Sequence, residues 1–240
     1  MGPGNSIYKF QTYLDCQLKI NPEEDTRKFI RPFVTISRKA GAGGIAIGNL
    51  LCEYLRKHDQ NSKNTCPWTV FDKNLVEEVI REHSLSDRVA QFMSEDRISE
   101  VDDILDELFG LHPSKWTLVH KTSQTILHLA QMGKSIIVGR GANVVTQKLH
   151  NGLHVRLVGS LEKRITYTRE QFDLSRREAI EMIRKRDLGK KNYLKKYFGK
   201  DIDDPLLYDL TINTDNIAYE EAARIIGDAV LSLSKRIRST

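Results

Sequence analysis

The chain alternates short apolar runs with longer segments of helical periodicity, and this alternation limits the folds that it can adopt. The runs are largely apolar throughout instead of alternating with polar residues, which is typical of strands buried on both faces of a parallel sheet. The sequence therefore predicts an α/β fold, with a five-stranded parallel sheet and helices on both faces. The expected strands cover residues 33–36, 68–71, 135–138, 153–158 and 208–212.

The length of 240 residues fits one large domain with an inserted subdomain. Residues 1–31 show weak periodicity and are predicted to form an N-terminal arm or a short helix. One domain is expected over 32–240. Inside it, a mostly helical segment of about 75–132 lies between the second and third strands, as an insertion would.

Composition excludes several classes of protein. No run approaches the roughly 18 consecutive apolar residues of a membrane span, so no membrane partner is expected. Cys16, Cys52 and Cys66 share no close spacing, which argues against a disulfide scaffold and a local zinc motif and favours a reducing compartment. The N-terminus also lacks a signal pattern, so we expect a cytoplasmic protein. The seven His are scattered, and no protein metal site is predicted.

The charge of the chain is divided between two segments of opposite sign. Residues 160–200 contain 13 Lys and Arg against 6 Asp and Glu, whereas residues 70–110 contain 4 against 12. The basic segment is expected either to meet an anionic ligand or to be a solvated helix face. Nucleic acid is disfavoured as a partner, because the acidic segment would repel a long polyanion.

A glycine cluster, Gly41 to Gly44, joins the first strand to a helix. Main-chain N–H groups in such a loop can bind phosphate, so we expect an anion at the amides of about 42–46. Against the P-loop pattern G-x-x-x-x-G-K-[ST], the chain has Arg38 at the first glycine, Gly44 at the lysine and Ile45 at the Ser/Thr. The dinucleotide pattern G-x-G-x-x-[GA] fits formally, and a tight turn without a ligand is the third interpretation.

The residues with chemistry follow the ends of the expected strands. They are Ser37 to Gly44 after the first strand, Asp72 after the second, Gly139 to Gly141 after the third and Ser160 after the fourth. In parallel sheets, ligands bind at the carboxyl ends of the strands. This placement is the strongest indication of a binding site in the sequence.

The order of short motifs resembles the cytidylate kinase-like family, relatives of bacterial cytidylate kinase among the P-loop nucleoside monophosphate kinases. That family typically has I-S-R followed by a G-x-G-G loop without the usual lysine. The resemblance implies a P-loop kinase core with a monophosphate-binding insertion and a lid at about 173–204. The motifs that carry it lie at 33–44, 71–73, 138–143, 186–187, 197–199, 204–205 and 208–214.

The resemblance also implies roles for individual residues. The donor nucleotide would be bound by Arg38, Lys39, Gly41, Ala42, Gly43, Gly44 and Ile45, with Arg38 or Lys39 reaching in where the lysine is missing. The acceptor would be bound by Asp72 and Arg140, and Gly141 replaces the aspartate of the G-R-D motif in cytidylate kinase proper. The catalytic candidates are Arg164, Arg184, Asp187 and Lys190.

The basic segment is interpreted as the lid, because phosphoryl transfer needs cations that converge on the bridging phosphates. Asp187 is expected to orient Arg184, and Gly189 to loosen the chain before Lys190. The predicted function is phosphoryl transfer from ATP, with Mg²⁺, to a nucleoside monophosphate or similar small acceptor. The alternative is a catalytically weak nucleotide-binding regulatory or interaction module, favoured by the missing lysine. The oligomeric state is not predicted.

Overall fold

The computed structural model describes residues 4–18, 31–58, 66–74, 95–109 and 117–239. Its strands form one five-stranded sheet in the order β2-β3-β1-β4-β5, and all four strand pairs are parallel. The expected sheet is thereby confirmed. The strands are β1 (Phe33–Arg38), β2 (Thr69–Phe71), β3 (Ser135–Val138), β4 (Gly152–Val158) and β5 (Leu210–Asn213).

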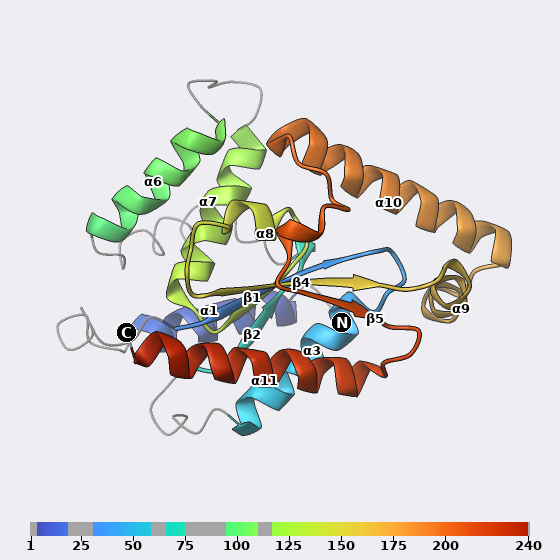
Figure 1. Ribbon diagram of the computed structural model, residues 1–240, viewed down its shortest axis with the longest axis horizontal. Helices are drawn as coiled ribbons and strands as arrows, with labels where there is room; N and C mark the ends of the chain where they lie inside the picture. Colours follow the sequence, from blue (N-terminus) through green and yellow to red (C-terminus); the bar gives the residue numbers. More distant parts are fainter. Residues whose placement is uncertain (1–3, 19–30, 59–65, 75–94, 110–116, 240) are drawn as a thin grey trace.

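Helices cover both faces of this sheet (Figure 1). Helices α3 and α11 pack together on one face, while α1, α7 and α8 contribute to the core on the other. The helices are α1 (Gly4–Leu18), α3 (Gly44–His58), α6 (Glu95–Phe109), α7 (Thr117–Met132), α8 (Ala142–Val145), α9 (Leu161–Phe172), α10 (Arg176–Phe198) and α11 (Tyr219–Arg238), with a short 3₁₀ turn, η2, at Pro205–Leu207.

Strand β4 shows how the pleat divides its side chains between the two faces. Leu153, Val155 and Leu157 are buried in the core that α3 and α11 cover. The intervening His154 and Arg156 are buried as well, but they are not part of that apolar cluster. A buried arginine near the carboxyl end of a strand needs polar partners, and these lie at the candidate site described below.

The N-terminal residues, which were expected to form an arm or a short helix, include the helix α1, and this helix belongs to the core. Phe10, Tyr13 and Leu14 are buried, and the rings of Phe10 and Tyr13 both meet Phe71 of β2. The Tyr13 hydroxyl donates a hydrogen bond of 2.6 Å to the carbonyl of Gly133. This helix therefore supports the strand that leads to Asp72.

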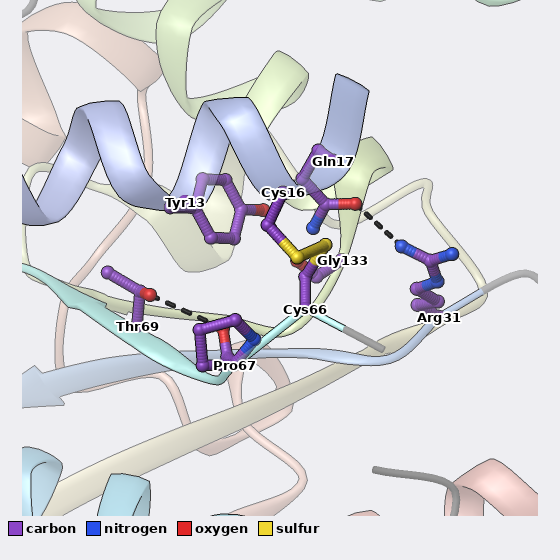
Figure 2. Close-up of a disulfide and its surroundings, with 8 residues drawn as sticks. All are labelled: Tyr13, Cys16, Gln17, Arg31, Cys66, Pro67, Thr69 and Gly133. Atoms are coloured by element: carbon purple, nitrogen blue, oxygen red, sulfur yellow. Dashed lines mark hydrogen bonds between the residues drawn. A yellow bond between two sulfur atoms is a disulfide. The ribbon is translucent and has the colours of Figure 1, made fainter. Parts of the chain in front are cut away.

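A disulfide joins Cys16 of α1 to Cys66, just ahead of β2 (Figure 2). The spacing of the cysteines in the sequence did not indicate this bond, because separation along the sequence does not report distance in the fold. The third cysteine, Cys52, is buried, and its thiol donates to the carbonyl of Trp68.

The helical insertion expected at about 75–132 is described only at α6 and α7, which pack against each other. Residues 75–94 and 110–116 lie outside the described part of the chain. Helix α10 begins with the expected capping box, in which Ser175 and Glu178 bond each other's main-chain N–H groups. None of the helices in the described residues is long and apolar enough to cross a membrane.

Candidate functional site

The loops that follow the strands meet at one edge of the sheet, as the sequence predicted. Because β1 pairs in parallel with both β3 and β4, the segments after Arg38, Val138 and Val158 leave the sheet on the same side. Strand β2 ends on that side too, directly before Asp72. The candidate site is built from these segments together with α9 and α10.

The glycine loop owes its glycines partly to contacts within the protein. Gly41 and Gly43 have φ values of 81° and 73°, which favour glycine. A Cβ at Gly41 would lie 2.6 Å from the carbonyl oxygen of Arg164, and one at Gly43 would enter the ring of Tyr219. Tight packing against α9 and α11 therefore selects glycine at these positions, whatever ligand binds nearby.

Some main-chain amides of this loop already have acceptors. The Ala42 N–H donates to the carbonyl of Lys39 at 3.2 Å, and the Ala40 N–H donates to Asp187 at 2.7 Å. An anion was expected at the amides of about 42–46, but the Ala42 N–H already has an acceptor within the loop. Helix α3 begins at Gly44, so the later amides belong to its first turn.

Arg38, at the end of β1, lies beside two glycines of the site. A Cβ at Gly44 would be 2.9 Å from Arg38 Cγ, and a Cβ at Gly139 would collide with the guanidinium. Burial lowers the pKa of Arg38, as do the neighbouring charges of Arg140 and Arg156, while Asp72 acts in the opposite direction. Arg38, Asp72 and Arg140, three candidates from separate loops, therefore share one electrostatic environment.

The segment after β3 is tightly coiled. Gly139, Arg140 and Gly141 have φ values of 92°, 57° and 71°, and an arginine in this region is strained. Burial lowers the pKa of Arg140, and Tyr193 of α10 lies close enough to act against that shift. The site thus holds a partly buried cation on a strained turn, which is where functional residues often occur.

Arg156 is a residue of the site that the sequence analysis did not single out. Its side chain is only 6 % exposed and donates to Ser37 Oγ at 2.8 Å and to Asp203 at 3.2 Å. The guanidinium also lies 5.6 Å from the ring centroid of Tyr208. A charged residue inside an otherwise apolar strand was the signal that could have identified it.

Arg164, Asp187 and Lys190 form one ionic cluster between α9, α10 and the glycine loop. Arg164 Nη1 lies 2.7 Å from one carboxylate oxygen of Asp187, and Lys190 Nζ lies 3.1 Å from the other. Burial alone would raise the pKa of Asp187, but the hydrogen bond from Ala40 and the two cations lower it. Asp187 is therefore held as a carboxylate, and its contacts position Arg164, Lys190 and the main chain of Ala40.

Lys190 is the cation of this cluster that is most easily titrated. Burial lowers its pKa to about 8, the neighbouring positive charges of Arg38 and Arg156 add to the shift, and Asp187 opposes it. With a pKa near 8, the charge of this lysine responds to an anion that enters the site, because a nearby negative charge raises the pKa.

Two expectations about the lid are wrong. Helix α10 runs without interruption through Gly189, so that glycine does not loosen the chain. Asp187 bonds Arg164, Lys190 and Ala40 and does not orient Arg184. Arg184 is exposed and lines a hollow along α10 with Arg177, Ile180, Glu181, Lys185 and Leu188.

The remaining candidates lie around the loop with different exposure. Ile45 is 47 % exposed on the first turn of α3, and Lys39 and Asp72 are half-buried. An isoleucine side chain has no atom that can bind a metal ion. Within the described ranges, no group of three His, Cys, Asp or Glu residues is placed to hold a metal.

Comparison with solved structures finds matches at low sequence identity. An uncharacterized protein from Eubacterium ventriosum matches with a TM-score of 0.54 and 18 % identity, over 84 % of this chain and 99 % of that chain. A shikimate kinase from Acinetobacter baumannii, in complex with shikimate, matches with a TM-score of 0.44 and 18 % identity, over 84 % and 94 %. A shikimate kinase from Bacteroides thetaiotaomicron matches with 0.39 and 12 %, over 87 % and 96 %. No curated protein matches the sequence.

The model of the cytidylate kinase-like family matches residues 33–216. This range begins with β1 and includes the glycine loop, Arg140, the ionic cluster and β5. The sheet order, the glycine loop between β1 and α3 and the match over most of the chain agree with one another: the chain belongs to the cytidylate kinase-like family and has a P-loop kinase-like fold.

Proposed function

We propose that this protein transfers a phosphoryl group from ATP to a nucleoside monophosphate or a similar small acceptor. The observation that carries the proposal is the convergence of cations from separate elements at the carboxyl edge of the sheet. Arg140, Arg156 and Arg186 all lie within electrostatic range of Arg38, and Lys190 lies within range of both Arg38 and Arg156. Phosphoryl transfer depends mainly on positioning and on the neutralisation of phosphate charge, which such a cluster supplies.

The donor phosphates would lie at the start of α3. The first turn of a helix offers main-chain N–H groups and the positive end of the helix dipole. Arg38 lies beside Gly44 at this end, and Lys190 extends from α10 toward the same region. These groups would neutralise the charge that develops on the transferred phosphoryl group.

The acceptor would lie on the side of Asp72 and Arg140. Arg140 follows β3 at the sheet edge, where a guanidinium can bind a phosphate through two parallel hydrogen bonds. Asp72 follows the neighbouring β2 and can accept hydrogen bonds from a sugar or a base. This half of the site resembles a phosphate clamp with one polar specificity group.

Magnesium would enter together with ATP as part of the substrate. Mg²⁺ typically keeps several waters and is bound through phosphates and one or two carboxylates. Asp72 is the carboxylate that the site offers near Arg38, whereas Ile45 takes the position of the usual hydroxyl ligand. The residues present therefore fit a metal held mainly by the nucleotide.

A second candidate function is that of a catalytically weak nucleotide-binding module. The observation in its favour is Gly44, which has no side chain where the P-loop carries its lysine.

A cytoplasmic location is part of the proposal too. The state of the Cys16–Cys66 pair in the cell tests this location, because cytoplasmic thiols are usually reduced. Rapid alkylation of cell extracts should then find Cys16 and Cys66 reduced.

The decisive experiment incubates the protein with labelled ATP, Mg²⁺ and a panel of nucleoside monophosphates and ribonucleosides. Label transfer to an acceptor would establish the enzyme and name its acceptor. ATP binding without transfer to any acceptor would favour the second candidate, and no binding of ATP would reject both.

The variant Arg140→Ala tests the acceptor half of the site. It should weaken acceptor binding while leaving the melting temperature nearly unchanged, whereas Arg140→Lys should retain part of the affinity because it keeps the charge. If Arg140→Ala instead unfolds readily, Arg140 is a structural residue and its assignment to the acceptor is wrong.

A further inference from the structure

The side chain of Arg38 occupies the space into which a side chain at position 44 would grow. A Cβ built on Gly44 would lie 2.9 Å from Arg38 Cγ, 3.0 Å from Cδ and 3.3 Å from Nε. The guanidinium then continues to Gly139, where a Cβ would collide with it and lie 3.1 Å from its Cζ. Both glycines therefore border the path of one arginine.

Because of this contact, a long side chain at position 38 and one at position 44 would compete for the same space. A lysine at position 44 needs a Cβ and a stem, and both would displace Arg38. In the P-loop pattern, position 44 is that of the lysine that reaches the β- and γ-phosphates. In this chain, Arg38 fills the space that the stem of a lysine at position 44 would need.

The guanidinium of Arg38 is available to a ligand. No residue in the described part of the chain forms a hydrogen bond or an ion pair with it. Its electrostatic neighbours Arg140, Arg156 and Arg186 all carry positive charge, and Asp72 is the opposing group. An arginine with five donors among like charges is stabilised when an anion binds.

We propose that Arg38 supplies the phosphate-binding cation that a P-loop lysine would supply from position 44, and that Gly44 lacks a side chain so that Arg38 can reach the site. The inference rests on the proposed function, in which the ligand is the triphosphate of ATP. It explains how this glycine loop binds phosphate without the usual lysine.

The neighbouring Lys39 is the competing source of this charge. Successive residues of an extended chain point to opposite faces, and Ser37 faces Arg156 on one side of β1. Arg38 therefore shares the side of α3 and borders Gly44, whereas Lys39 follows the end of β1 and does not border either glycine. The structure favours Arg38 over Lys39.

The test measures the affinity of the full chain for a fluorescent ATP analogue with Mg²⁺. Arg38→Gln keeps most of the stem and should weaken binding about 10- to 100-fold, the range of a lost charge-assisted hydrogen bond. Lys39→Ala should lose less, and the matched surface variant Arg224→Gln should bind like the wild type. Gly44→Lys alone should lower the melting temperature, because the two side chains compete for one space.

The double variant Arg38→Ala/Gly44→Lys tests whether a lysine at position 44 can replace the arginine at position 38. It should bind the analogue more tightly than Arg38→Ala and should melt at a higher temperature than Gly44→Lys. If the folded double variant binds the analogue no more tightly than Arg38→Ala, the two positions are not interchangeable and this part of the proposal is wrong. A folded Arg38→Gln that binds like the wild type would overturn the role of Arg38 and leave the proposed function intact.

A second probe, inorganic tripolyphosphate, separates the inference from the proposed function. If the wild type binds tripolyphosphate through Arg38 but does not bind the ATP analogue, the inference holds and ATP is not the donor. If the wild type binds neither probe, both the inference and the proposed function fail.

Discussion

Arg164 and Asp187 form an ion pair of 2.7 Å that holds both main-chain polar groups of Ala40. Arg164 donates to the carbonyl of Ala40 at 3.1 Å, and Asp187 accepts from its N–H at 2.7 Å. Ala40 opens the glycine loop, so this single pair ties α9 and α10 to the loop. The basic helix is therefore fixed to the candidate site.

Removing the charge of Asp187 should loosen this connection. We expect Asp187→Asn to lower the free energy of unfolding by about 1–3 kcal/mol, because a largely buried arginine loses its charged partner. Denaturant unfolding measures the change. Arg176→Gln, which breaks the exposed pair with Glu162, is the control and should have a much smaller effect.

The effect of Asp187 should also depend on pH. Its pKa in the folded protein is lower than the ordinary value, so its contribution to stability is present above about pH 4 and is lost as the pH falls through the folded pKa. The wild type and Asp187→Asn should therefore converge in acid. A difference in stability that stays constant down to low pH would contradict the role of this carboxylate.

Lys190 should make nucleotide binding sensitive to pH near 8. Its pKa in the free protein is about 8, and a bound triphosphate would raise it, so binding should take up protons. The affinity for ATP should fall as the pH rises from 7 to 9. Calorimetry in buffers of different ionisation enthalpy measures the proton uptake, and Lys190→Met should remove most of it.

The same shift has a consequence for stability, with a defined sign. Between pH 8 and the ordinary pKa of 10.5, the unfolded chain binds more protons at Lys190 than the folded protein does. The stability of the wild type relative to Lys190→Met should therefore rise with pH across this window. A fall across the same window would show that Lys190 is not desolvated.

Gly189→Ala tests the rigidity of α10. Gly189 lies inside the helix without a positive φ, and a Cβ there would meet nothing within 4 Å. The substitution should stabilise the protein by about 0.5–1 kcal/mol, because glycine costs more backbone entropy than alanine in a helix. Thermal or denaturant unfolding measures the gain, and turnover should be unchanged.

Gly199→Ala is the matched control at the end of the same helix. Gly199 also has open space around it, but its φ of 67° makes it a left-handed cap. This substitution should destabilise the protein by about 1 kcal/mol. If Gly189→Ala stabilised the fold but abolished turnover, α10 would have to bend at Gly189 during the reaction.

The Cys16–Cys66 disulfide should stabilise the oxidised protein. Its reduction should lower the free energy of unfolding by about 2–4 kcal/mol, because the bond closes a long loop in the unfolded chain. Cys16→Ser should melt at the same temperature with or without a reductant, whereas Cys52→Ala should respond like the wild type. If the native protein alkylates at Cys16 and Cys66 without reduction, the bond is not formed.

The position of the sheet and of the site edge could be predicted from the sequence. Short apolar runs and the glycine cluster after Ile36 are local patterns, and they report strands and a strand-to-helix turn directly. Parallel strands end on the same side, so Arg38, Asp72 and Arg140 could be placed together before any contact was known. The capping box at Ser175 was equally local.

The partners of the charged residues were decided only by the tertiary structure. Helical spacing placed Arg184 and Asp187 near one another on α10, but it contains no information on which helix packs alongside. The approach of α9 gave Asp187 the partner Arg164, and left Arg184 exposed. In the same way, the pairing of β4 with β1 brings Arg156 to its hydrogen-bond acceptor Ser37, and the packing of α1 beside β2 brings Cys16 to Cys66. The physical reason is the same in each case: a long-range pair forms where packing brings two side chains within a few ångström, and neither residue type nor periodicity specifies that distance.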